Sequence, residues 1–81
     1  MALSSEERNK RKIEYMLNRL SSENNISHED IVKIYRDYLS AISEIGIEFV
    51  EKEFLYYFTL RMKNDKNKSF TFFKDYILKI N

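Results

Sequence analysis

The residue types that most often carry out chemistry are scarce in this sequence. His28 is the only histidine, and the chain has no cysteine. Because a zinc site draws most of its ligands from thiolates and imidazoles, the sequence predicts no metal site. The single glycine, Gly46, leaves no glycine-rich loop of the kind that cradles phosphates. We therefore expect neither a metal nor any other cofactor.

The acidic residues give little support for catalysis. Glu29 and Asp30 form a pair beside His28, but carboxylates in the first turn of a helix interact favourably with the helix dipole and need no catalytic role. No serine near His28 has a spacing that indicates a nucleophile. The other acidic candidates are more typical of a solvated surface: Glu44, Glu48, Glu51 and Glu53. The sequence thus predicts a protein that is not an enzyme.

One cluster of cations has a spacing that suits binding. At about 100° per residue, a helix would place five side chains on one arc of about 100°. These residues are Arg8, Arg11, Lys12, Tyr15 and Arg19. Such a face can contact phosphates through its cations and stack its ring on a base. The competing interpretation is an ordinary solvated helix face.

The composition indicates which elements position these residues. The chain has 81 residues, enough for one domain over residues 1–81 but not for a second core. It is 43% hydrophobic and has a net charge of +1, which argues against intrinsic disorder. With no proline and one glycine, it lacks the residues that tight turns between strands require. We therefore predict an all-α fold, a small four-helix domain.

The first two predicted helices span residues 5–21 and 28–45. Ser4 and Glu7 have capping-box spacing at the first, whose opening turns lack apolar residues, so residues 1–12 are expected to project into solvent. Ser27 caps the second helix, and Gly46 ends it because glycine readily takes a left-handed conformation.

The last two predicted helices span residues 48–63 and 70–80. Ser69 is the expected cap of the final helix. The segment that begins there, residues 69–73, also suits a strand by residue propensity, but the chain offers no second strand to pair with it. A helix is therefore the better interpretation.

A helix-turn-helix reader of DNA would place its turn at Gly46. That motif normally has a small residue four positions before the glycine and an apolar residue six positions after it. Here these positions hold Ile42 and Lys52. The sequence therefore favours a simple helix end at Gly46 over a helix-turn-helix.

The third predicted helix carries apolar residues on a second face. Phe49, Tyr56 and Leu60 have the spacing i, i+7 and i+11, nearly opposite the main apolar stripe. A central helix wrapped by the other three would explain them. The alternative is an interface with another chain, because aromatic-rich apolar patches are typical of interface cores.

We expect a small protein-binding regulator, such as an inhibitor, adaptor or immunity-type protein. The partner is a protein, in a homodimer or a stable hetero-complex. The alternative is a dimeric nucleic-acid-binding protein that uses the basic face of the first helix, and a structural subunit of a phage or cell-surface assembly stays open. The sequence has no apolar segment long enough to predict a membrane span, so a cytoplasmic location is expected. The abundance of Asn, Lys and Ile fits a low-GC bacterium, a phage or a plasmid as the source.

Overall fold

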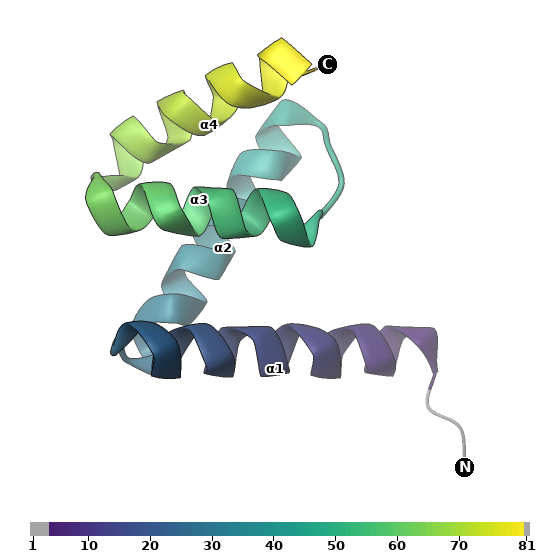
Figure 1. Ribbon diagram of the computed structural model, residues 1–81. Coiled ribbons are helices and arrows are strands. Elements are labelled where there is room, and N and C mark those ends of the chain that lie inside the picture. Colours follow the sequence, from purple (N-terminus) through teal and green to yellow (C-terminus); the bar gives the residue numbers. More distant parts are fainter. Residues whose placement is uncertain (1–3, 81) are drawn as a thin grey trace. The chain divides into compact units, whose positions relative to one another are not determined.

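The fold consists of helices joined by short loops. The computed structural model describes residues 4–80, and within that range it contains four helices and no strand. The helices are α1 (Ser5–Asn24), α2 (His28–Ile45), α3 (Glu51–Lys63) and α4 (Lys66–Ile80) (Figure 1). The predicted all-α class is therefore confirmed, and so is the helical interpretation of residues 69–73.

The chain divides into two compact units at a point inside α2. One unit ends at Lys33 and the other begins at Ile34. The first contains α1 and the opening of α2, and the second contains the rest of α2 with α3 and α4. The single domain over residues 1–81 stays a prediction.

Helix α1 begins as predicted and ends later than predicted. The backbone N–H of Glu7 donates to Ser4 Oγ at 3.1 Å, which is the expected N-terminal cap. The helix continues past residue 21 to Asn24 because Asn25 supplies the left-handed residue that ends it, with φ of 53°. All the described side chains of residues 4–12 are exposed.

Helix α2 has the bounds predicted from its sequence. The N–H of Asp30 donates to Ser27 Oγ at 3.1 Å. Gly46 has φ of 87°, and the N–H groups of Gly46 and Ile47 both donate to the carbonyl of Ile42. The Ile47 bond is the 6→1 bond of a Schellman motif, and the Gly46 bond is the 5→1 bond of the simpler left-handed end that a glycine permits.

Helix α3 begins at Glu51, three residues later than predicted. Val50, the residue before it, is extended, with φ of −133° and ψ of 123°. The hydroxyl of Tyr38 accepts from the N–H of Val50 and donates to its carbonyl, both at 3.3 Å. A side chain on α2 therefore pairs with the N–H of Val50, while the Val50 carbonyl also accepts the first bond of the helix from the N–H of Phe54.

Helix α4 begins at Lys66, four residues earlier than predicted. The carboxylate of Asp65 accepts from the N–H of Lys68 at 2.8 Å and so takes the capping role assigned to Ser69. Ser69 instead lies inside the helix and is fully buried. Residues 66–69, which lie outside the predicted helix, thus form the first turn of α4.

The second unit is built around an aromatic core that closes on Tyr38. This side chain is fully buried, and its ring lies 5.3–5.8 Å from four others, mostly edge to face. The four rings belong to Phe49, Phe54, Tyr57 and Phe73. Edge-to-face contacts are favourable because the positive edge of one ring meets the negative face of another. Through them, one residue of α2 packs against both α3 and α4.

Candidate protein-binding surface

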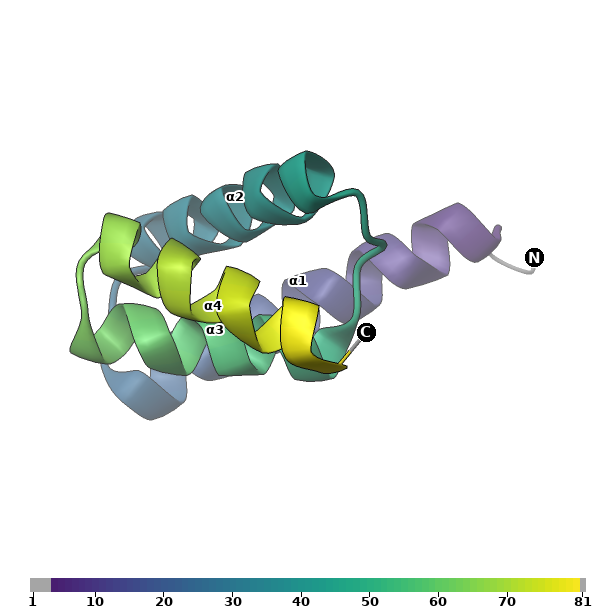
Figure 2. The same cartoon turned by 90° about the horizontal axis from the view of Figure 1, so that it is seen from above.

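Helices α3 and α4 form an antiparallel pair in the second unit (Figures 1 and 2). Each helix buries one face and leaves another exposed. On α4 two adjacent residues differ in exposure: Phe73 is fully buried, whereas Phe72 is 47% exposed. The pair therefore contributes to the core and presents apolar side chains outside it.

Two tyrosines join α3 to α4 on the exposed side. The rings of Tyr56 and Tyr76 lie 4.6 Å apart at 48° to each other. They are 36% and 38% exposed. Tyr56 also lies 6.5 Å from the ring of Phe73, so the pair rests on the core with its outer edge free.

The apolar surface continues along both helices from this pair. Leu60 lies one turn beyond Tyr56 on α3, and Phe72 lies one turn before Tyr76 on α4. Because the helices are antiparallel, these two side chains extend the surface in the same direction. Leu60 is half-buried and Phe72 is exposed. We call the four residues Tyr56, Leu60, Phe72 and Tyr76 the aromatic face.

The structure brings together two of the three residues predicted for the interface. Tyr56 and Leu60 share one stripe of α3. Phe49 does not belong to it, because it precedes the helix and its ring lies 6.1 Å from Tyr35 and 5.8 Å from Tyr38 on α2. The expected i, i+7, i+11 helical set is therefore wrong at its first member, since residues 48–50 are not helical.

Sequence reasoning missed Tyr76 and did not join Phe72 to the predicted interface. The two residues are four apart on α4, a spacing that places them on one side of a helix. That signal was available in the sequence. The position of Tyr76 beside Tyr56 was not, because it depends on how α3 and α4 pack.

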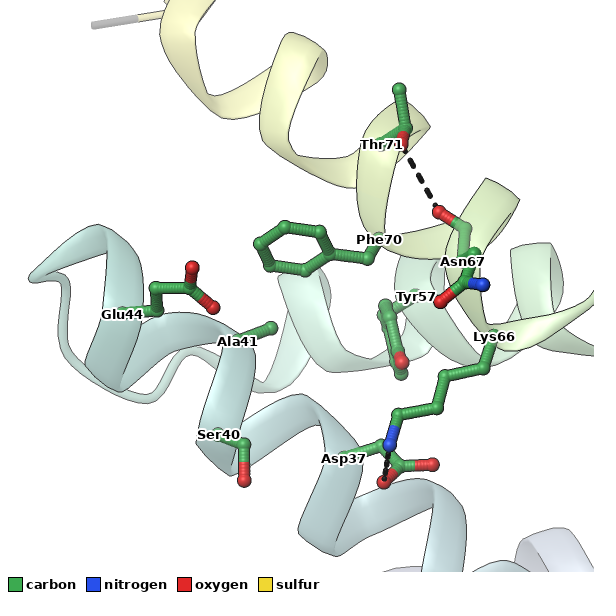
Figure 3. A pocket seen from close by; sticks show the side chains of 9 residues that line it. All are labelled: Asp37, Ser40, Ala41, Glu44, Tyr57, Lys66, Asn67, Phe70 and Thr71. Atoms are coloured by element: carbon green, nitrogen blue, oxygen red, sulfur yellow. Dashed lines mark hydrogen bonds and ion pairs between the residues drawn. The ribbon is translucent and has the colours of Figure 1, made fainter.

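A cleft of about 380 Å³ lies between α2 and the α3–α4 pair (Figure 3). Ala41 and the rings of Tyr57 and Phe70 form its apolar part. Asp37 and Lys66 stand at one end, and Glu44 lies near the Phe70 end. The cleft is thus lined by both apolar and charged side chains.

One of the two carboxylates at this cleft, that of Asp37, is already paired with cations. Asp37 Oδ2 lies 2.7 Å from Arg61 Nη1, and its Oδ1 lies 3.4 Å from Lys66 Nζ. Burial lowers the pKa of Arg61, but hydrogen bonds to Asp37 and Tyr57 outweigh this effect and raise the pKa overall. The arrangement ties α2 to the α3–α4 pair, which is a structural role. Within residues 4–80, no group of three His, Cys, Asp or Glu side chains could hold a metal ion.

The basic face lies on α1, in the first unit. Its five side chains, Arg8, Arg11, Lys12, Tyr15 and Arg19, are all exposed. Tyr15 is 70% exposed. Arg19 Nε donates to Glu23 Oε1 at 2.8 Å, so this cation has an acidic partner one turn away. Arg8 and Lys12 line a shallow polar hollow together with Ser5 and Asn9.

Comparison with known proteins adds nothing to this picture. No family model matches the sequence, and neither the curated proteins nor the solved structures yield a match. Within the described part of the chain, no helix is both long and apolar enough to cross a membrane.

Proposed function

We propose that this chain is a non-enzymatic regulator, of the inhibitor, adaptor or immunity type, that binds a partner protein through the aromatic face. The observation that carries the proposal is the Tyr56–Tyr76 pair, two tyrosine rings that contact each other across two helices while more than a third of each stays exposed. Tyrosine is enriched in the energetically dominant positions of protein interfaces. A cytoplasmic location is part of the proposal, since a chain without cysteine fits a reducing compartment.

The rigidity of the face supports a binding role. Tyr56 and Tyr76 contact each other, and Tyr56 also contacts the fully buried ring of Phe73. Side chains held in this way lose little conformational entropy on binding, because their rotamers are already restricted. A partner would therefore meet a preformed surface.

The test is selection of short peptides from a displayed random library on the wild-type protein. Selected peptides should bind the double variant Tyr56→Ala/Tyr76→Ala at least about tenfold more weakly, the loss expected for interface anchors. Leu78→Ala is the matched control, because Leu78 is exposed on α4 but lies about 160° from Tyr76 around the helix. Peptides that bind all three proteins equally would refute the aromatic face as the binding site.

A second candidate function is nucleic-acid binding through the basic face of α1. It is favoured by Tyr15, whose ring is 70% exposed on the same arc as Arg8, Arg11 and Lys12. Replacing these three cations together with alanine should weaken binding of labelled single-stranded or duplex DNA and flatten its salt dependence. No change in anisotropy of either DNA at low salt would exclude this function.

A further inference from the structure

The aromatic face lies between lysines in both helices. On α3, Lys52 precedes Tyr56 by four residues and Lys63 follows it by seven. On α4, Lys68 precedes Phe72 by four residues and Lys79 follows it by seven. At about 100° per residue, each lysine falls within about 80° of the aromatic stripe on its own helix. Each helix therefore presents an aromatic segment with a lysine at either end.

The antiparallel packing places these lysines in two groups. The Tyr56–Tyr76 contact fixes the register of the helices. In that register Lys52 and Lys79 lie toward one end of the face, and Lys63 and Lys68 lie toward the other. Eleven residues separate the two lysines on each helix, which corresponds to about 16 Å at the usual rise per residue. The face is thus an apolar strip with a pair of cations at each end.

These cations are not neutralised within the described residues. All four lysines are exposed. None of the four forms an ion pair with another residue in the range 4–80. Three carboxylates lie nearby. Glu53 is half-buried on α3 with one oxygen fully enclosed, and Asp75 is one turn from Phe72 toward the edge away from α3. Asp65 accepts from the N–H of Lys68, so at that end two lysines stand against one carboxylate. Four exposed lysines therefore determine the sign of the potential at the ends of the face.

Resting on the proposed function, we infer that the partner is an acidic protein segment, with carboxylates at both ends of an apolar stripe. An amphipathic helix with acidic residues about three turns apart fits this pattern, because its apolar side chains would lie on the rings while its carboxylates reach the lysines. The charges would direct orientation and speed association, and the aromatic face would supply most of the affinity.

Three other occupants fit less well. In a two-fold association of two copies through this face, lysine ends would lie on lysine ends. Nucleic acid would use ring faces for stacking, yet Tyr56 and Tyr76 already cover part of each other at 4.6 Å. An anionic lipid surface would attract the lysines, but its charge is spread evenly and does not match two separate groups of cations. Each is an outcome of the test.

The test uses peptides selected on the wild-type protein whose binding depends on Tyr56 and Tyr76. These peptides should carry net negative charge. The variants Lys52→Glu/Lys79→Glu and Lys63→Glu/Lys68→Glu should each weaken binding at least about tenfold. The control Arg36→Glu/Lys74→Glu changes the net charge equally but alters exposed cations on α2 and on the side of α4 about 160° from Tyr76, and it should change binding no more than about twofold.

Several results would overturn the inference, and they separate it from the proposed function. Peptides that need the tyrosines but are neutral or basic would refute the acidic partner and leave protein binding standing. An equal loss in the control would assign the effect to net charge alone. A dimer by light scattering, or binding to oligo-dT or phosphatidylserine vesicles, would replace the acidic partner if Tyr56→Ala/Tyr76→Ala abolished it. If no peptide depends on the tyrosines, both proposals fail.

Discussion

The second unit uses aromatic residues in two opposite ways. Around Tyr38, rings from α2, α3 and α4 meet edge to face, and the central side chain is fully buried. On the aromatic face, the rings of Tyr56 and Tyr76 meet at a tilt of 48° and stay 36% and 38% exposed. The first arrangement removes apolar surface from water, and the second leaves such surface available. Residue type alone therefore does not distinguish a core from a binding surface.

Helix phase creates the difference. Adjacent residues on a helix point about 100° apart, so Phe72 and Phe73 belong to different surfaces despite being neighbours. Phe73 contacts Tyr38 and Tyr57 in the core, whereas Phe72 is 47% exposed. The two side chains are of the same type and adjacent in the chain, so a comparison of their variants isolates the effect of burial.

The largest predicted effect comes from truncating the core member of this pair. Phe73→Ala should destabilise the protein by about 3–5 kcal/mol, because it removes a buried ring and leaves a cavity among the rings of Tyr38 and Tyr57. Phe72→Ala should cost at most about 1 kcal/mol, as for most exposed positions. Urea unfolding followed by circular dichroism gives both values. Equal losses in the two variants would show that Phe72 belongs to the core as well.

A smaller effect is expected from removing one hydroxyl. Tyr38→Phe keeps the ring contacts but deletes the bonds to the N–H and carbonyl of Val50. The Val50 carbonyl keeps its bond from the N–H of Phe54, but leaving the Val50 N–H without a partner at the start of α3 should cost about 1–3 kcal/mol. Tyr76→Phe is the control from the aromatic face, where an exposed hydroxyl can bond to water, and its unfolding free energy should stay within about 0.5 kcal/mol of wild type. A Tyr38→Phe variant as stable as Tyr76→Phe would mean that the Val50 bonds contribute nothing.

The parts of the fold that the sequence predicted correctly depend on local signals. Ser27 and Gly46 mark the two ends of α2, and each acts through backbone groups within a few residues. The start of α3 depends instead on Tyr38, twelve residues before Val50, and no local pattern contains that contact. The start of α4 did have a local signal, because Asp65 stands three residues before the N–H that it caps, but Ser69 offered a second possible cap four residues later.

The candidate surface was predictable to a similar extent. The surplus apolar residues Tyr56 and Leu60 were evident from helix phase on one helix. Tyr76 was missed because its importance comes from a ring on α3, and the paired lysines acquire meaning only from the register of two antiparallel helices. Periodicity reveals which face of a helix is apolar, whereas it does not reveal which faces of two helices join into one surface.

The last prediction concerns alkaline pH, where ionisation of Tyr38 and Tyr35 should weaken the fold. Burial raises the pKa of Tyr38 and of Tyr35 above the usual 10.0. For Tyr38, the bond to Val50 opposes this effect and the nearby Glu53 adds to it. Below pH 10 both tyrosines are neutral whether the chain is folded or unfolded, so their full contribution to stability is present.

As the pH rises past 10, these tyrosines ionise more readily in the unfolded chain than in the folded one. The free energy of unfolding should therefore fall, by at most about 1.4 kcal/mol per pH unit for each group, until the folded pKa is reached. Urea midpoints measured at pH 9, 10 and 11 test this decline. The double variant Tyr35→Phe/Tyr38→Phe should start from a lower stability but lose less of it over this range. If its decline matches that of wild type, ionisation of the aromatic core does not cause the alkaline loss, and the distinction between the buried and exposed tyrosines rests on packing alone.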